Sequence, residues 1–298
     1  MSVKSILCVY RGEPAELNAL NAALCLAKSG RAGLRILHVA NKSLPLADGL
    51  GIVGYGISAY GDGTVMEIIE RGERELTQTA ETKAQAAAQF HGLDIAQDGS
   101  RAVLGQSHVT FRTVTGIPSE IVPREGRTVD LIVMPYESGP AGDLGVLLNA
   151  LHHTGRAVLA IPNVSSVQPT QTGFARTVCI AWDGSLAASR AVREAIPHLL
   201  HADAIYLVRI QQARDMYDSV PEEDILGYLR SHCIEAVCLH VTAGQHSPGE
   251  ALLQKAGSLK ADLLVMGAYG HSHIGEFFFV GTTDYIVKHS HLPLLLTH

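Results

Sequence analysis

Short apolar runs alternate with amphipathic stretches along the chain, and the same order occurs twice. In the first half, an apolar run at Ser5–Val9 is followed by a stretch at Ala15–Ser29 whose apolar residues recur with helical spacing. A second apolar run follows at Leu34–Val39. The matching segments of the second half are Thr177–Ala181, Leu186–Leu200 and Ala204–Val208. Each half therefore predicts a strand, a helix and a second strand.

The later segments of the two halves also match. Val129–Met134 resembles Ala261–Met266, and each half then ends on a further apolar run, at Ala157–Ile161 and at Pro293–Leu296. Nearly continuous apolar runs are typical of parallel strands that are covered on both faces. Strands that alternate with helices imply right-handed crossovers. The pattern predicts an α/β protein made of two tandem doubly wound parallel-sheet domains.

The boundary between the two domains is predicted at a polar segment. Asn163–Gly173 contains a proline and has little periodicity, which is typical of a linker. We expect domains at residues 1–163 and 174–298. The first contains a Gly- and Tyr-rich insertion at Leu44–Gly63 and a long helical run at Val65–His91, whereas the second has a shorter helix that starts near Pro221.

Composition and charge narrow the classes of partner. The chain has 298 residues, of which 47% are hydrophobic and 17% charged, with a formal net charge of -6. A chain with no basic surplus is poorly suited to neutralise phosphates, so nucleic acid is not expected as a partner. The uncharged stretch Gly49–Gly61 is too short to span a bilayer, and the amino terminus does not resemble a signal peptide. We expect a cytoplasmic protein that does not enter a membrane.

The five cysteines are scattered and odd in number, which favours reduced thiols. Cys233 and Cys238 have no second cysteine pair nearby, so their spacing does not predict a zinc site. His271 and His273, with His289 and His291 further on, are read as exposed histidines in preference to a metal cluster. No metal site is therefore predicted, apart from an Mg²⁺ ion that would accompany a nucleotide at Asp183.

A glycine-containing loop after the last long strand carries the strongest functional signal. Gly267 and Gly270 directly follow the strand, and Gly281-Thr282-Thr283 precedes a helical stretch at Asp284–His289. Glycines let a backbone approach a ligand closely, and free amides at a helix amino terminus attract anions. Ligands of open α/β sheets bind at the carboxyl ends of the strands, where this loop must lie.

These residues resemble the universal stress protein family. That family has a Gly-x2-Gly-x9-Gly-(Ser/Thr) loop after its fourth strand and an Asp at the end of its first strand. Here Gly267 and Gly270 open the loop and Asp183, in Ala181–Ser185, supplies the acid. The resemblance implies an adenine-nucleotide alpha-hydrolase-like fold and a site for ATP or a related adenine nucleotide. It implies nucleotide contacts at Ala181, Asp183, Met266, Gly267, Gly270, Val280, Gly281, Thr282 and Thr283.

By this resemblance, Asp183 faces the ribose, the backbone of Met266 and Gly267 lies along the ligand, and the Thr282 and Thr283 hydroxyls meet the phosphates. One position departs from the family pattern. The family has a glycine after Gly270 and nine further residues, whereas this chain has Val280 at that place. Either the loop is shifted by one residue, so that Gly281 takes the glycine role, or the phosphate end is altered. Valine's branched Cβ disfavours a positive φ and would weaken phosphate binding.

The first half lacks this signature. It has Tyr10-Arg11 where Asp183 is expected and Pro135 where Gly267 is expected. We therefore predict one nucleotide site per chain. A separate GxGxxG match at Gly49–Gly54 lacks the strand before it and the helix after it, and it is not read as a dinucleotide site. Phe277-Phe278-Phe279 is read as core under the loop in preference to an adenine-stacking platform.

Three functions compete. The leading hypothesis is a stress-response protein that binds an adenine nucleotide and changes shape or partners with occupancy, without being an enzyme. A slow ATPase or nucleotidyl transferase at the same loop is an alternative, although no Walker A, GxSxG or HExxH motif occurs. A stress-induced scaffold that binds no nucleotide is the third.

The two last strands are expected to pair within the chain. The resemblance implies association of domains through these strands, and an unpaired apolar edge is an aggregation hazard. We expect an internal pseudo-dimer of Ala157–Ile161 and Pro293–Leu296, with a homodimer of whole chains as a further alternative.

Overall fold

The computed structural model of the protein describes residues 3–40, 62–96, 105–139, 144–164, 175–211, 220–268 and 279–298, with backbone alone for 62–70, 211, 279 and 280. Several sequence features lie outside these residues. They are the insertion up to Gly61 with its GxGxxG match, most of the predicted linker, Gly270, His271, His273, Phe277 and Phe278.

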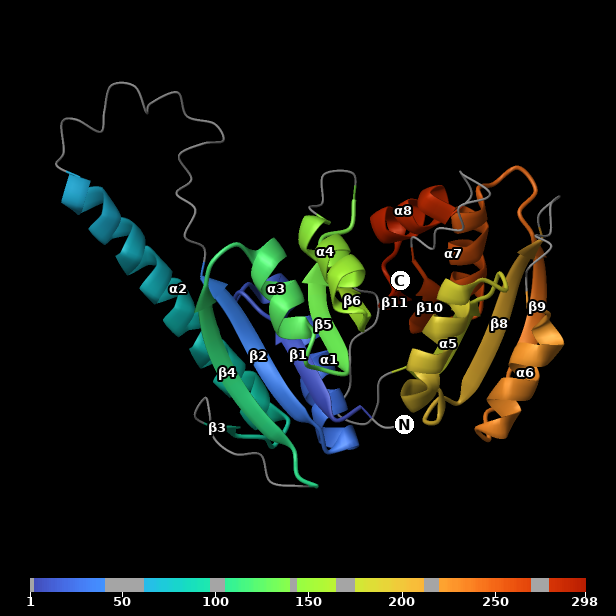
Figure 1. Cartoon of the computed structure of the whole chain (residues 1–298), viewed down its shortest axis with the longest axis horizontal. Helices are drawn as coiled ribbons and strands as arrows, with labels where there is room; N and C mark the ends of the chain where they lie inside the picture. The colour runs from blue at the N-terminus through green and yellow to red at the C-terminus, as the bar shows by residue number, and fades with distance from the viewer. Residues whose placement is uncertain are drawn as a thin grey trace.

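The strands of the described residues form one sheet of 11 strands, in the order β3-β4-β2-β1-β5-β6-β11-β10-β7-β8-β9 (Figure 1). The strands are β1 Ser5–Val9, β2 Gly33–Ala40, β3 Ile95–Ala96, β4 His108–Thr115, β5 Leu131–Tyr136, β6 Ala157–Pro162, β7 Thr177–Ala181, β8 Ala204–Gln211, β9 Val237–Thr242, β10 Leu263–Gly267 and β11 Leu294–Thr297. The helices are η1 Pro14–Glu16, α1 Leu17–Gly30, α2 Asp62–Phe90, α3 Pro118–Gly126, α4 Gly145–Thr154, α5 Leu186–Leu199, α6 Glu222–Ser231, α7 Pro248–Ser258 and α8 Phe279–His289.

The strand order is the same in both halves, apart from the additional edge strand β3 of the first half. In the second half, β7, β8 and β9 run outward in chain order, and the chain then returns to place β10 and β11 on the other side of β7. The first half repeats this with β1, β2 and β4 on one side and β5 and β6 on the other. Every pair within a half is parallel, so the predicted doubly wound α/β fold is confirmed. Each half thus has a switch point, between β1 and β5 and between β7 and β10.

Two hydrophobic clusters lie on opposite faces of the sheet. One includes buried residues of α1, α2, α5 and α6, and the other includes residues of α3, α4, α7 and α8. Central strands contribute to both clusters by alternation: Leu263 and Val265 of β10 belong to the first, and Leu264 and Met266 to the second. Burial on both faces explains why the sequence shows continuous apolar runs at these strands.

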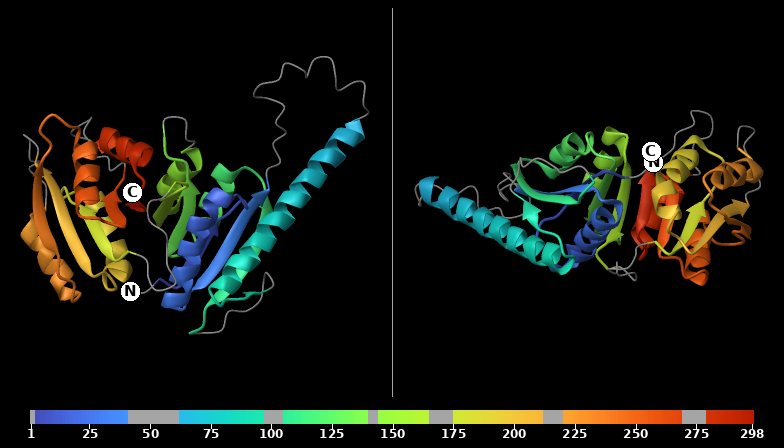
Figure 2. Two further views of the ribbon diagram at one scale, coloured as in Figure 1. Left: turned by 180° about the vertical axis from the view of Figure 1, so that it is seen from behind. Right: turned by 90° about the horizontal axis from the view of Figure 1, so that it is seen from below.

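The halves are joined by an antiparallel pair of strands. Leu294, Leu295 and Leu296 of β11 lie opposite Ala160, Leu159 and Val158 of β6, and all six are fully buried. The right-hand view of Figure 2, in which the molecule is seen from below, shows β6 beside β11 at its centre. The strands that the sequence analysis expected to pair are therefore paired within the chain, and neither apolar edge is exposed.

An aspartate at the equivalent position of each half holds the starts of two adjacent strands together. Asp130 accepts hydrogen bonds from the backbone amides of Lys4 and Ser5, at 2.8 and 3.0 Å. Asp262 accepts the same two bonds from Arg176 and Thr177, at 2.8 and 2.9 Å. The repeated Asp in the two matching sequence runs thus holds the start of β1 beside β5 and the start of β7 beside β10.

Some elements differ from expectation. The last helix begins at Phe279 and not at Asp284, so Gly281, Thr282 and Thr283 belong to its first turns. The long helix α2 has 29 residues, or about 43 Å at the usual rise. Figure 1 shows it extending beyond the sheet. No helix in the described ranges has both the length and the apolar character needed to cross a bilayer.

Candidate functional site

A cleft opens at the switch point of the second half, between the carboxyl ends of β7 and β10. Its lining residues are Ala181, Trp182, Asp183, Ala188, Val208, Ile210, Pro248, Leu252, Met266, Gly267 and Thr282. Five of these were expected from the sequence to contact a nucleotide: Ala181, Asp183, Met266, Gly267 and Thr282. The structure therefore brings together residues that are as much as 101 positions apart in the chain. A switch point is where open α/β sheets usually bind ligands.

The turn after β7 holds Asp183 at this cleft. Gly184 has a φ of 75°, a conformation that glycine adopts without strain. The turn lets Asp183 Oδ1 accept a hydrogen bond from the Ser185 amide at 2.9 Å. Ser185 Oγ in turn accepts from the Ala188 amide at 3.1 Å and caps the amino terminus of α5. The position of the carboxylate is thus set by the same local bonds that start α5.

Trp182 is a lining residue that the sequence analysis did not select. Its amide donates to the Val208 carbonyl at 2.9 Å, which extends the β7–β8 pairing past the end of β7. The side chain is 2% exposed, and among the described residues its Nε1 has no hydrogen-bond partner. A buried indole N–H usually finds an acceptor, so this donor is a candidate for contact with a ligand or a water.

Gly267 is required by packing inside the protein. A Cβ at this position would lie 2.6 Å from the Ala187 carbonyl carbon and 2.7 Å from the Ala188 nitrogen. Both are backbone atoms of α5, which therefore crosses the end of β10 at very close range. The sequence analysis explained this glycine by close approach of a ligand, but the structure shows that close approach of a helix already demands it.

The residues expected near the phosphates lie in the first turns of α8. Thr282 lines the cleft, whereas Thr283 is completely buried and lies outside the lining. An added Cβ at Gly281 would have no atom within 4 Å. Val280 has helical backbone, and helical φ values suit valine, so the backbone argument for weakened phosphate binding does not hold. The first-turn amides of a helix have no intrahelical partner, so the start of α8 remains a candidate anion site.

Four further lining residues come from elements that the loop motif does not include. Val208 and Ile210 are two apart on β8 and share one face of the strand, and Pro248 and Leu252 are four apart on α7. Ser247 caps α7 by accepting from the Glu250 amide at 3.2 Å. The capping sequence Ser247–Glu250 predicts where this helix begins, but only the fold places its first turn beside β8.

Different side chains stand at the equivalent place in the first half. Tyr10, which follows β1 as Trp182 follows β7, is fully buried. Arg11 occupies the place of Asp183, and its Nε is 2.8 Å from Oε1 of the buried Glu16. A carboxylate of the protein itself therefore already pairs with Arg11.

Helix α2 covers the turn of the first half. A Cβ at Gly12 would lie 2.9 Å from the Ala80 Cα, and Lys83 Nζ donates to the Gly12 carbonyl at 2.7 Å. In the described part of the second half, the counterpart of α2 is α6, which has only 10 residues. The long helix after the first-half insertion thus packs against the turn that follows β1.

A doubly wound sheet with a cleft at one switch point defines an α/β protein with a candidate ligand site. Comparison with known proteins identifies its family. The model of the universal stress protein family matches residues 175–298. A universal stress protein of Thermus aquaticus is 30% identical over 133 residues, which cover 41% of this chain and 97% of that protein. The chain belongs to the universal stress protein family.

Solved structures extend the likeness in fold to the whole chain. A universal stress protein from Archaeoglobus fulgidus superposes with a TM-score of 0.69 at 14% identity, covering 98% of this chain and 97% of the other. A protein of unknown function from Pseudomonas aeruginosa superposes with a TM-score of 0.54 at 13% identity, covering 99% of this chain and 92% of the other. The arrangement of two such halves in one chain therefore occurs in other proteins.

Proposed function

We propose that the cleft of the second half binds one adenine nucleotide per chain and that the protein acts by binding and not by catalysis. The observation that carries this proposal is the meeting of Asp183, Met266, Gly267 and Thr282 in one cleft at the β7–β10 switch point. Membership of the universal stress protein family supports it.

The chemistry of the lining suits a nucleoside. Most lining residues are apolar or aromatic, and a purine ring binds well in such surroundings. Asp183 is the one ionisable side chain among the described lining residues, and a carboxylate accepts hydrogen bonds from ribose hydroxyls. Adenine and ribose are thus expected to supply more of the affinity than the phosphates.

The same lining argues for binding in preference to hydrolysis. Phosphoryl transfer requires cations that neutralise the developing charge, and the described lining contains no Lys, Arg or His. Lys288 of α8, the nearest candidate in the sequence, is paired with Asp284 at 2.8 Å. An accompanying Mg²⁺ would have Asp183 as its protein ligand in the cleft.

Isothermal titration calorimetry with AMP, ADP and ATP, each with and without Mg²⁺, tests the proposal. We expect one site per chain. Asp183→Asn keeps an oxygen that can accept from Ser185 but removes the charge, and affinity should fall about tenfold or more. Asp203→Asn, which removes a charge from the exposed surface of the same half, is the matched control and should bind as the wild type does.

Two sites per chain, or unchanged affinity in Asp183→Asn, would contradict the proposal. Trp182 offers a second readout, because it is the single tryptophan of the chain and lines the cleft. A nucleotide that enters the cleft should change its fluorescence, and the change should saturate with the calorimetric affinity. An assay for released phosphate in the same samples separates binding from turnover.

A further inference from the structure

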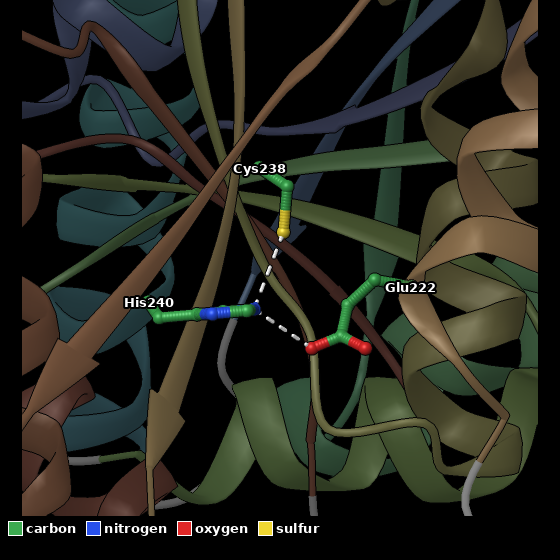
Figure 3. Close-up of side chains that lie close together, drawn as sticks. All are labelled: Glu222, Cys238 and His240. Carbon is green, nitrogen blue, oxygen red and sulfur yellow. Dashed lines mark hydrogen bonds and ion pairs between the residues drawn. The ribbon is translucent and has the colours of Figure 1, made fainter.

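A cysteine, a histidine and a glutamate converge at the outer edge of the second half. Cys238 and His240 are two apart on β9, the last strand in the sheet order, so both side chains lie on one face. Glu222 is the first residue of α6, which packs on that face. Figure 3 shows the sulfur of Cys238 and a carboxylate oxygen of Glu222 directed toward the same ring nitrogen of His240.

The distances among these atoms approach those of a metal site. Cys238 Sγ is 3.7 Å from His240 Nε2, and His240 Nε2 is 3.0 Å from Glu222 Oε1. All three atoms lie within 4.8 Å of one another. Zinc bonds to sulfur, nitrogen and oxygen at tetrahedral angles separate the ligand atoms by about 3.3–3.6 Å. Small rotations of the partly buried Glu222 and Cys238 and of the exposed His240 would therefore complete the geometry.

The arrangement does not fit a nucleophilic cysteine. In a catalytic triad, one nitrogen of the histidine faces the nucleophile and the other faces the carboxylate. Here the sulfur and the carboxylate share Nε2. Burial, followed by the charges of Glu222 and Glu223, raises the pKa of the Cys238 thiol, whereas activation requires a lowered pKa. A metal site, in contrast, requires three ligand atoms that converge on one point.

The charges around the cluster are compatible with a divalent cation. Two of the three ligands, a thiolate and a carboxylate, would neutralise the ion, and Glu223 adds a negative charge nearby. Arg209 on β8 opposes the cation, with its Nη1 3.1 Å from Glu222 Oε1. A carboxylate has two oxygens and several lone pairs, so Glu222 can keep this bond and still bind a metal. Ligating carboxylates commonly have such outer partners, which fix their orientation.

We propose that Cys238, His240 and Glu222 form a site for a divalent transition-metal ion, with Zn²⁺ as the best match. A thiolate is a soft ligand that Mg²⁺ and Ca²⁺ do not favour. Three protein ligands leave a fourth tetrahedral position for water or for a ligand from outside. The bound ion links the start of α6 to the edge strand β9 and displaces the proton of the Cys238 thiol.

Titration of the reduced full-length protein with Co²⁺ alone tests this site. A thiolate bound to Co²⁺ gives a charge-transfer absorption in the near ultraviolet, which histidines elsewhere in the chain cannot produce. We expect the band to saturate at one equivalent, and Zn²⁺ to remove it by competition. Cys238→Ser should abolish the band, and His240→Ala and Glu222→Gln should each weaken Co²⁺ binding by about tenfold or more.

Two controls match these variants. Cys233→Ser removes the exposed free cysteine nearest in sequence. His246→Ala breaks a similar His–Glu pair, in which His246 Nδ1 lies 2.9 Å from Glu250 Oε1. Both should keep the band and the affinity, and circular dichroism should show that every variant is folded. Absence of the band in the wild type, its persistence in Cys238→Ser, or its loss in Cys233→Ser would overturn the proposal.

Discussion

Adding a single methyl group at Gly267 should destabilise the second half. In Gly267→Ala the new Cβ would lie 2.6 Å from the Ala187 carbonyl carbon, against an optimum of about 3.5–4.0 Å for two carbons. The atoms that it meets belong to the backbone of α5 and cannot rotate away. Helix α5 and strand β10 would have to separate by roughly 1 Å, in a region where Leu263, Leu264 and Val265 are completely buried.

The expected cost follows from two opposing terms. Overpacking of a close contact costs typically 1–3 kcal/mol. Alanine reduces the freedom of the unfolded chain and returns about 0.4–1 kcal/mol. The central values of these two ranges, about 2 and about 0.7 kcal/mol, leave a net loss of about 1.3 kcal/mol in the free energy of unfolding. Displacement of α5 also moves the Asp183–Ser185 turn, so nucleotide affinity should fall as well.

Gly281→Ala is the matched control, because it makes the same chemical change in open space. No atom lies within 4 Å of an added Cβ, and the residue is helical, so alanine should leave stability unchanged or raise it by up to about 1 kcal/mol. Urea unfolding, followed by circular dichroism and by Trp182 fluorescence, measures both variants. A midpoint of Gly267→Ala at or above that of the wild type would refute the reasoning.

Two more predictions concern the stability of the fold at low pH and the aspartate that precedes β10. Burial, followed by the charge of His201, lowers the pKa of His198 to about 4. In the unfolded chain His198 takes up a proton near pH 6.5, whereas in the folded chain it does so only near pH 4. The free energy of unfolding should therefore fall as the pH is lowered from about 6.5 to about 4. The urea midpoint should be lower at pH 5 than at pH 7, and this difference should be smaller in His198→Leu. An unchanged pH dependence in that variant would show that His198 is not its cause. Asp262→Ala should cost about 1–3 kcal/mol, because the amides of Arg176 and Thr177 lose a charged acceptor. An effect below about 0.5 kcal/mol on the urea midpoint would show that water replaces these bonds.

Much of the fold follows from short-range pattern. The strands β1 and β7 have the bounds that hydrophobic runs predict, because a strand buried on both faces must be apolar at every position. The pairing of β6 with β11 was predicted because an apolar edge requires a partner. In contrast, β4 and α4 were not predicted. Strand β4 has an alternating pattern, with its last residues partly exposed. Weak or mixed periodicity left these elements unassigned.

The candidate nucleotide site was predictable in part. Asp183 and Gly267 were found because each follows a strand directly, and the carboxyl ends of parallel strands meet at one edge. Trp182 and Leu252 were not found, because nothing local indicates which helix or neighbouring strand faces that edge. The reason for Gly267 also came from the structure alone, since the contact that excludes a Cβ is with a helix about 80 positions earlier in the chain.

The sequence by itself determined the class of fold, its duplication and the half that retains the family's site residues, because these depend on periodicity and on residues adjacent to strand ends. Only the tertiary structure decided which distant side chains meet. Cys238 and His240 lie on the face of β9 that α6 covers, and this brings Glu222 to the same nitrogen. Such a meeting depends on strand register and helix placement, which are set by the packing of the whole sheet and leave no local mark in the sequence.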